Sequence, residues 1–75
     1  MTADEIAALF DEMIAAQRRK TLTLARRIDP AFTEDDLFQP HDHPKLASHA
    51  VYQFEDGILA GLLSAKAAFL ARLKG

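Results

Sequence analysis

The chain of 75 residues contains no cysteine, only three glycines and three prolines, and no apolar run long enough for a membrane span. The absence of cysteine excludes disulfide bonds and thiolate metal sites, and it leaves the redox compartment open. The longest apolar run covers residues 57–65, whereas a spanning helix needs about 20 residues. The N-terminal residues are acidic where a secretion signal is basic. We therefore expect a soluble cytoplasmic protein that does not enter membranes.

Neither sign of charge dominates, since the formal net charge is −2. This balance argues against broad electrostatic attraction to nucleic acid or to anionic lipid. Hydrophobic residues make up 49% of the chain, which is more than a disordered segment contains. A single domain of this size has a marginal core unless disulfides, a metal or a second subunit stabilise it. Because disulfides are excluded, we expect oligomerisation, with metal binding as the alternative.

Two stretches of the chain carry mostly apolar side chains at steps of three and four residues, the spacing of one face of an α-helix. The first stripe consists of Ile6, Phe10, Met13, Gln17, Thr21, Leu24 and Ile28. The second consists of Val51, Phe54, Ile58, Leu62, Ala65, Phe69 and Leu73. We predict one all-α domain over residues 1–75, an antiparallel two-helix hairpin with long helices at about 3–28 and about 49–73.

The ends of the long helices carry recognisable signals. Thr2 and Glu5 have the spacing of a capping box, in which each side chain bonds the backbone of the other residue. Pro30 disfavours helical geometry at the residue before it, so the first helix should end near Ile28. Ser48 is the best candidate for the N-cap of the second long helix, because its hydroxyl can accept from the helix backbone.

The connection between the long helices is predicted to be partly ordered, because twenty structureless residues are unusual in a compact domain. A second capping pattern predicts a short helix at about 34–39, which Pro40 stops. The apolar pair Leu37 and Phe38 is expected to cover the open end of the hairpin. The prolines on both sides make the histidine-containing segment between them a rigid bend.

Two faces flank the apolar stripe of the second long helix. One is small and smooth (Gly57, Gly61, Ser64 and Ala68), and the other is rich in leucine (Tyr52, Leu59, Leu63 and Leu70). Tight packing on the first helix and docking of another chain both account for the small residues. Three adjoining apolar faces exceed what one helix covers, so we predict a homodimer that forms a four-helix bundle. The predicted interface residues are Ile58, Leu59, Gly61, Leu62, Leu63, Phe69 and Leu70.

A candidate metal site lies in the connection, where His41 and His43 stand close to Glu34, Asp35 and Asp36. Imidazole and carboxylate groups are ligands of zinc, nickel and non-haem iron. The spacing matches no strong metal motif, and bend formation and capping account adequately for these residues, so we favour a structural role. Metal binding by His41 and His43 therefore stays as an alternative, and no cofactor is expected.

Three polar residues lie within or beside the helical stripes. Gln17 and Thr21 interrupt the first stripe, either as a polar layer that fixes helix register or at its edge, where they reach water. We favour the edge. Glu55 has no second carboxylate or nucleophile nearby in sequence, so we expect an ion pair rather than general acid or base chemistry. Its expected partner is Lys66 of a second copy across a dimer interface, or Arg18 or Arg27 of the first helix, and an exposed position at the helix start is the alternative.

No glycine-rich phosphate loop, nucleophile elbow or helical metal motif is present. We therefore expect a non-enzymatic, homodimeric module for protein interaction or regulation, which binds a second copy of itself. Another protein is left open as a further partner. Two alternatives stay open. One is a small metal-binding protein that uses the connection, and the other is an enzyme whose dimer interface brings Glu55, His49 and Arg18 into one polar pocket.

Overall fold

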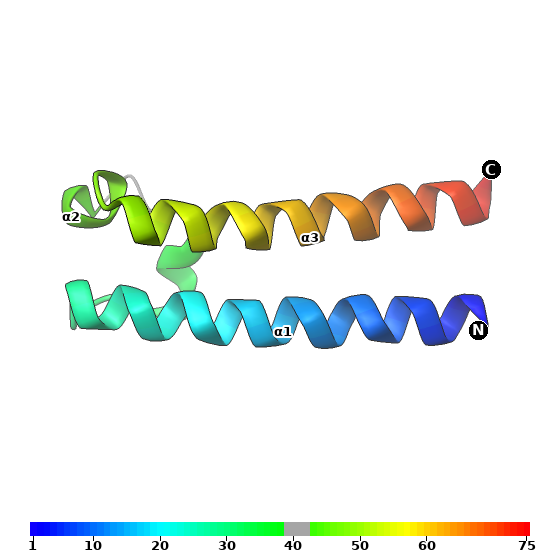
Figure 1. The fold of residues 1–75 in the computed structure, drawn as a ribbon, viewed down its shortest axis with the longest axis horizontal. Helices are drawn as coiled ribbons and strands as arrows, with labels where there is room; N and C mark the ends of the chain where they lie inside the picture. The colour runs from blue at the N-terminus through cyan, green and yellow to red at the C-terminus, as the bar shows by residue number, and fades with distance from the viewer. Residues whose placement is uncertain (39–42) are drawn as a thin grey trace.

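The computed structural model describes residues 1–38 and 43–75 and shows two long antiparallel helices that pack side by side (Figure 1). They are α1 (Ala3–Ile28) and α3 (Ala50–Lys74), and the short 3-10 helix η1 (Glu34–Phe38) and α2 (Pro44–Ala47) lie between them. The molecule measures 41 × 19 × 19 Å, and both termini lie at the end opposite α2. The predicted all-α hairpin is confirmed. Within the described residues, no helix is both long and apolar enough to cross a bilayer.

The first helix begins at the predicted capping box. The Thr2 hydroxyl accepts from the Glu5 backbone N–H at 3.1 Å, and Glu5 Oε1 accepts from the Thr2 backbone N–H at 3.1 Å. Two backbone donors that a helix start leaves without intrahelical partners are thereby satisfied. Arg26 and Arg27 lie in the last turn of α1, where positive charge suits the helix dipole.

The start of α3 differs from the prediction by one residue. The N-cap is His49, whose Nδ1 accepts from the Tyr52 backbone N–H at 3.3 Å. Ser48, the predicted cap, instead ends α2, and its hydroxyl donates to the Pro44 carbonyl at 3.1 Å. The prediction was wrong because α2 comes directly before α3 and uses the serine for its own last turn.

The most completely buried part of the core lies at the end of the hairpin where the connection folds back. Its buried members come from every helical element and from the segment after α1: Ala25, Phe32, Leu37, Leu46 and Tyr52. Leu37 is buried in this core from η1, beside the helix pair rather than over its open end, whereas the side chain of Phe38 lies outside the described part of the chain. The rest of the seam between α1 and α3 is a single layer of side chains, with Ile14 and Leu59 buried in it.

The face that α3 turns toward α1 is not the predicted apolar stripe in its first half. Tyr52, Glu55 and Leu59 are buried there, while Val51 is 54% and Phe54 67% exposed. The predicted stripe is therefore rotated toward solvent over this half. Several adjoining faces of α3 are apolar, so hydrophobicity alone does not decide which of them meets α1.

The small face of α3 does not pack against α1. A Cβ atom built on Gly57 or on Gly61 meets no heavy atom within 4 Å apart from its own helix backbone and chain neighbours. Of the two interpretations left open for the small residues, tight packing within the hairpin is thus excluded at these two positions.

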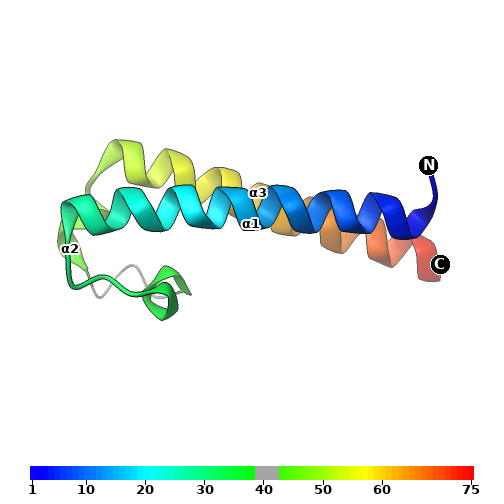
Figure 2. The same cartoon turned by 90° about the horizontal axis from the view of Figure 1, so that it is seen from below.

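The connection covers only one side of the helix pair. Figure 2 shows η1 to one side of α1 and α3. On that side Glu34 of η1 lines a hollow together with Ala15, Arg18 and Leu22 of α1. The opposite side of the pair faces the viewer in Figure 1, and no described part of the connection lies over it.

Candidate functional site

A buried polar network links the middle of α1 to α3. The side-chain amide of Gln17 donates to Glu55 Oε2 at 2.7 Å and to the Glu55 carbonyl at 2.8 Å. The Thr21 hydroxyl donates to the Gln17 carbonyl at 2.8 Å, and Thr21 is fully buried. The favoured interpretation, in which Gln17 and Thr21 reach water at the edge, is therefore wrong. Gln17 meets the Glu55 carboxylate of α3 in the seam, and Thr21 is buried there with its hydroxyl bonded to Gln17.

The surroundings of Glu55 keep its carboxylate ionised. The hydrogen bond from Gln17 lowers the pKa of Glu55 most, burial opposes this, and Lys20 lowers the pKa further from 3.2 Å away. An ion pair was expected, but its partner is Lys20. Lys66 pairs instead with Asp11. A carboxylate with a lowered pKa and occupied oxygens is a weak general base, so this network suits fixing the register of α1 and α3.

The residues of the suggested enzyme pocket do not come together within one chain. Glu55 points toward Lys20 on one side of the helix pair, Arg18 lies beside Glu34 on the other, and His49 caps α3. The Nε atom of Arg18 is buried without a hydrogen-bond partner among the described residues. The three groups thus lack the shared geometry that acid–base chemistry requires.

His43 joins three segments of the chain at the connection. Its Nδ1 lies 2.8 Å from Asp29 Oδ2 after α1, and its Nε2 lies 3.4 Å from Asp36 Oδ2 in η1. The ring also contacts Phe32 edge-on, with centroids 4.9 Å apart. The hydrogen bond to Asp29 raises the pKa of His43 most, burial opposes this, and Asp36 adds to the rise. The hydrogen bond from His43 lowers the pKa of Asp29 most, whereas the pKa of Asp36 is lowered mainly by hydrogen bonds from the backbone and hydroxyl of Thr33.

The described residues do not form a metal site around His43. Asp29 and Asp36 bind opposite nitrogens of the imidazole, so their oxygens do not converge on one point. No group of three or more ligand side chains within residues 1–38 and 43–75 is placed to hold an ion. The other half of the hypothesis, His41, lies outside the described residues.

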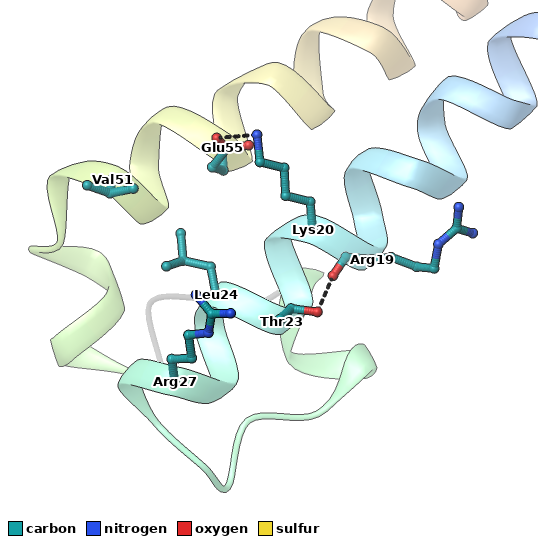
Figure 3. A pocket seen from close by; sticks show the side chains of 7 residues that line it. All are labelled: Arg19, Lys20, Thr23, Leu24, Arg27, Val51 and Glu55. Atoms are coloured by element: carbon teal, nitrogen blue, oxygen red, sulfur yellow. Dashed lines mark hydrogen bonds and ion pairs between the residues drawn. The ribbon is translucent and has the colours of Figure 1, made fainter.

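A pocket of about 350 Å³ lies on the uncovered side of the helix pair (Figure 3). Lys20 reaches across it to Glu55, and Leu24 points from α1 toward α3. The apolar residues of its lining are Leu24 and Val51, which we call its floor. The cationic residues of its lining are Arg19, Lys20 and Arg27, which we call its rim. The complete lining is Arg19, Lys20, Thr23, Leu24, Arg27, Val51 and Glu55.

Large exposed apolar side chains continue from this pocket along both helices. On α1, Leu9 and Met13 precede Lys20 and Leu24 at steps of four and seven residues, which places all four along one side of a helix. On α3, Phe54 and Ile58 follow Val51 at three and seven residues and share its side in the same way. We call this surface the open face: Leu9, Met13, Leu24, Val51, Phe54 and Ile58.

The predicted interface residues fall into three groups. Leu59 is buried against α1 with 6% exposed, so it is not available to another chain. Leu62 and Phe69 are half-buried, and the Phe69 ring lies 5.9 Å from that of Phe10. The remaining members are exposed: Ile58, Gly61, Leu63 and Leu70.

Sequence reasoning missed the contribution of α1 to this surface. Leu9 and Met13 are exposed although Met13 belongs to the predicted inward stripe. The four-residue spacing of this pair was visible, but only the packing of α3 shows which side of α1 is covered. No protein-family model, no curated protein and no solved structure matches the chain.

Proposed function

We propose that this protein is a non-enzymatic interaction module that self-associates through its open face. The observation that carries the proposal is the exposure of large apolar side chains from both helices on the one side that the described connection leaves uncovered. Contiguous apolar patches of several hundred Å² are rare on monomeric soluble proteins. A second copy of the chain is the simplest partner, because a two-fold pair hides the open face of both molecules at once.

The energetics of a small hairpin support self-association. The layer between α1 and α3 is thin, and a core of this size is marginal without a staple. Each Å² of apolar surface that the open face buries would stabilise the folded state by about 25 cal/mol. Loss of translational and rotational freedom offsets part of this gain. The product is a four-helix bundle, in which facing stripes form one shared core.

The polar groups favour a structural rather than a chemical role. Glu55 is bonded to Gln17 and Lys20, and His43 is held between two aspartates. Catalytic groups need a correctly placed partner and an open position for a substrate. Among the described residues these titratable side chains bond to one another instead, which is how a scaffold uses them.

The experiment compares two matched substitutions by sedimentation velocity over low to high micromolar concentrations. Ile58 and Leu63 are 37% and 39% exposed, but they lie about 140° apart around α3, with only Ile58 on the open face. We expect the wild type and Leu63→Glu to be dimers and Ile58→Glu to be a monomer.

Two outcomes would contradict the proposal. A wild-type chain that stays monomeric at high micromolar concentration refutes self-association. A dimer that Leu63→Glu disrupts and Ile58→Glu leaves intact refutes the open face as the contact surface. Circular dichroism of each variant checks that the helices still form.

A further inference from the structure

The charges of α1 are separated along its length. Its first ten residues hold four acidic side chains and no basic one, and its last eleven hold five basic side chains and no acidic one. The acids are Asp4, Glu5, Asp11 and Glu12, and the bases are Arg18, Arg19, Lys20, Arg26 and Arg27. The charges of α3 run the same way, with Glu55 and Asp56 early and Lys66, Arg72 and Lys74 late.

This separation already matches the antiparallel hairpin. Lys20 in the basic half of α1 pairs with Glu55 in the acidic part of α3, and Asp11 in the acidic half pairs with Lys66. A helix with an acidic start and a basic end is complementary to an antiparallel copy of itself, and it repels a parallel copy. The same holds for α3 against another α3.

We propose that two copies pack antiparallel across the open face, α1 against α1 and α3 against α3, so that their connections lie at opposite ends of the dimer. This inference rests on the proposed self-association and adds its orientation. In this arrangement every acidic half meets a basic half of the partner. In the alternative two-fold arrangement, with α1 parallel to α1, each α1 lies over the partner's α3 and the two pockets face each other. The basic residues of both pocket rims would then come together, with only Glu55 of each copy to offset them.

The two-fold axis passes near Ala16, the middle of α1. Residues whose numbers add to about 32 then lie at one level on the two α1 helices, because both rise by 1.5 Å per residue. Glu12 lies at the level of Lys20 and meets its neighbour Arg19, and Glu5 meets Arg27. Gly61 lies close to the middle of α3 with free space beside its Cα atom. Small residues at the centre let the helices approach closely.

This register also assigns an occupant to the pocket. Leu9 of the partner subunit lies at the level of Thr23, directly over the floor that Leu24 and Val51 form. Three side chains at steps of four and three residues share one side of a helix. Glu5 of the partner subunit therefore lies on the side of that leucine nearer to Arg27. Glu12 of the partner subunit lies on the side nearer to Arg19.

The positive charges of the pocket rim are complementary to the two glutamates on either side of the partner's leucine. Lys20 is engaged by Glu55 within its own chain, which leaves the two arginines of the rim to face the partner. Glu5 uses Oε1 for the capping box, so its Oε2 is the oxygen that faces Arg27 across the interface. An apolar floor with a basic rim fits a leucine between two glutamates, and the start of α1 presents this pattern.

Single cysteines test the orientation, because the chain has none of its own. Under mild oxidation Ala16→Cys should form a disulfide-linked dimer. Leu9→Cys alone and Thr23→Cys alone should not, since the two copies of residue 9 lie about 21 Å apart along the bundle and a disulfide needs Cα atoms closer than about 7 Å. An equimolar mixture of Leu9→Cys and Thr23→Cys should yield the linked heterodimer. Ala67→Cys, away from the open face, is the control for random collision.

Sedimentation of each variant under reducing conditions separates the two proposals. If the variants are dimers and Leu9→Cys links to itself, or Ala16→Cys links no faster than Ala67→Cys, the antiparallel orientation is refuted and self-association stands. If the wild type is a monomer, self-association fails and the orientation fails with it. Cross-linking by the mixture and by Ala16→Cys, but by neither Leu9→Cys nor Thr23→Cys alone, is the result the inference requires.

Discussion

Glu55 places a carboxylate in a seam of apolar side chains, and two neighbouring side chains stabilise its ionised form. Gln17 donates to it, and Lys20 lies on its solvent side. A buried charge without such partners would be strongly destabilising, because the group loses its hydration and gains nothing in exchange. The pair Gln17 and Glu55 thus links one position of α1 to one position of α3, which specifies their relative register.

The lowered pKa of Glu55 predicts the pH range in which it stabilises the fold. Its contribution is complete above the ordinary glutamate pKa of about 4.3 and is lost as the pH falls through the lower pKa of the folded state. Glu55→Gln should therefore melt below the wild type at neutral pH, and the two melting temperatures should converge in acid. Thermal denaturation from about pH 7 to pH 3 measures this. A difference that is independent of pH would contradict the assignment.

The raised pKa of His43 predicts the opposite dependence of stability on pH. Its pKa is raised in the folded protein, so its contribution is complete below the ordinary histidine pKa of about 6.5 and is lost as the pH rises through the folded value. His43→Gln should melt below the wild type. The difference between the two melting temperatures should be largest at mildly acidic pH and smallest at alkaline pH. Asp29→Asn, which removes the nearer carboxylate, should weaken the same dependence. A difference in melting temperature that grows as the pH rises would contradict this role of His43.

For Tyr52 we expect that removing the hydroxyl leaves the stability of the fold nearly unchanged. Its ring is fully buried, its hydroxyl has no hydrogen-bond partner among the described residues, and burial raises its pKa to about 12. Removing a buried hydroxyl that bonds nothing is close to neutral or stabilising. Tyr52→Phe should therefore change the unfolding free energy by less than about 1 kcal/mol, whereas Tyr52→Ala should cost about 3–5 kcal/mol or prevent folding. Urea unfolding measures both, and a large loss in Tyr52→Phe would show that the hydroxyl is bonded.

At the scale of elements, local sequence signals determine where each helix begins and ends. Tertiary contacts determine which face of each helix is buried. The start of α1 could be predicted because Thr2 and Glu5 act on adjacent backbone, and its end because Pro30 acts on the residue before it. The cap of α3 could not, because histidine is an unusual N-cap and α2 takes the preferred serine. The network between Gln17 and Glu55 was also out of reach, since no local rule relates residues on different helices.

The capping box predicts a moderate local effect. Thr2→Ala removes the acceptor of the Glu5 backbone N–H, and loss of such a cap costs typically about 1 kcal/mol. Thr2→Ser keeps the hydroxyl and should behave like the wild type. Chemical denaturation of the three proteins at one concentration tests this. Equal stabilities for Thr2→Ala and the wild type would mean that the first turn frays and contributes nothing.

At the scale of the whole molecule, the connection gives the hairpin two different sides. η1 lies on one of them, and the open face with its pocket lies on the other. The sequence predicts that the chain has more apolar surface than a hairpin hides, but it does not identify the exposed part. Val51 and Phe54 belong to the predicted inward stripe and lie on the surface, because Tyr52 and Glu55 occupy the seam beside them.

The separation of charge along α1 and α3 has a consequence for solution conditions. Ion pairs between the two copies at exposed positions are screened by salt. The dimer should therefore dissociate more readily as the salt concentration rises, although burial of the open face opposes this. Glu12→Lys should weaken the dimer by up to about thirtyfold in Kd, because two copies of a cross-subunit pair are each worth up to about 1 kcal/mol. Sedimentation at low and high salt measures both effects, and a Kd unchanged by either would contradict the charge argument.

The molar mass of the wild-type chain in solution tests the central claim most directly. Equilibrium sedimentation across low to high micromolar concentrations should give twice the chain mass of 8.3 kDa, with a melting temperature that rises with concentration, because association stabilises the folded state by mass action. A mass of one chain at the highest concentration, together with a melting temperature independent of concentration, would contradict the claim that the open face binds a second copy.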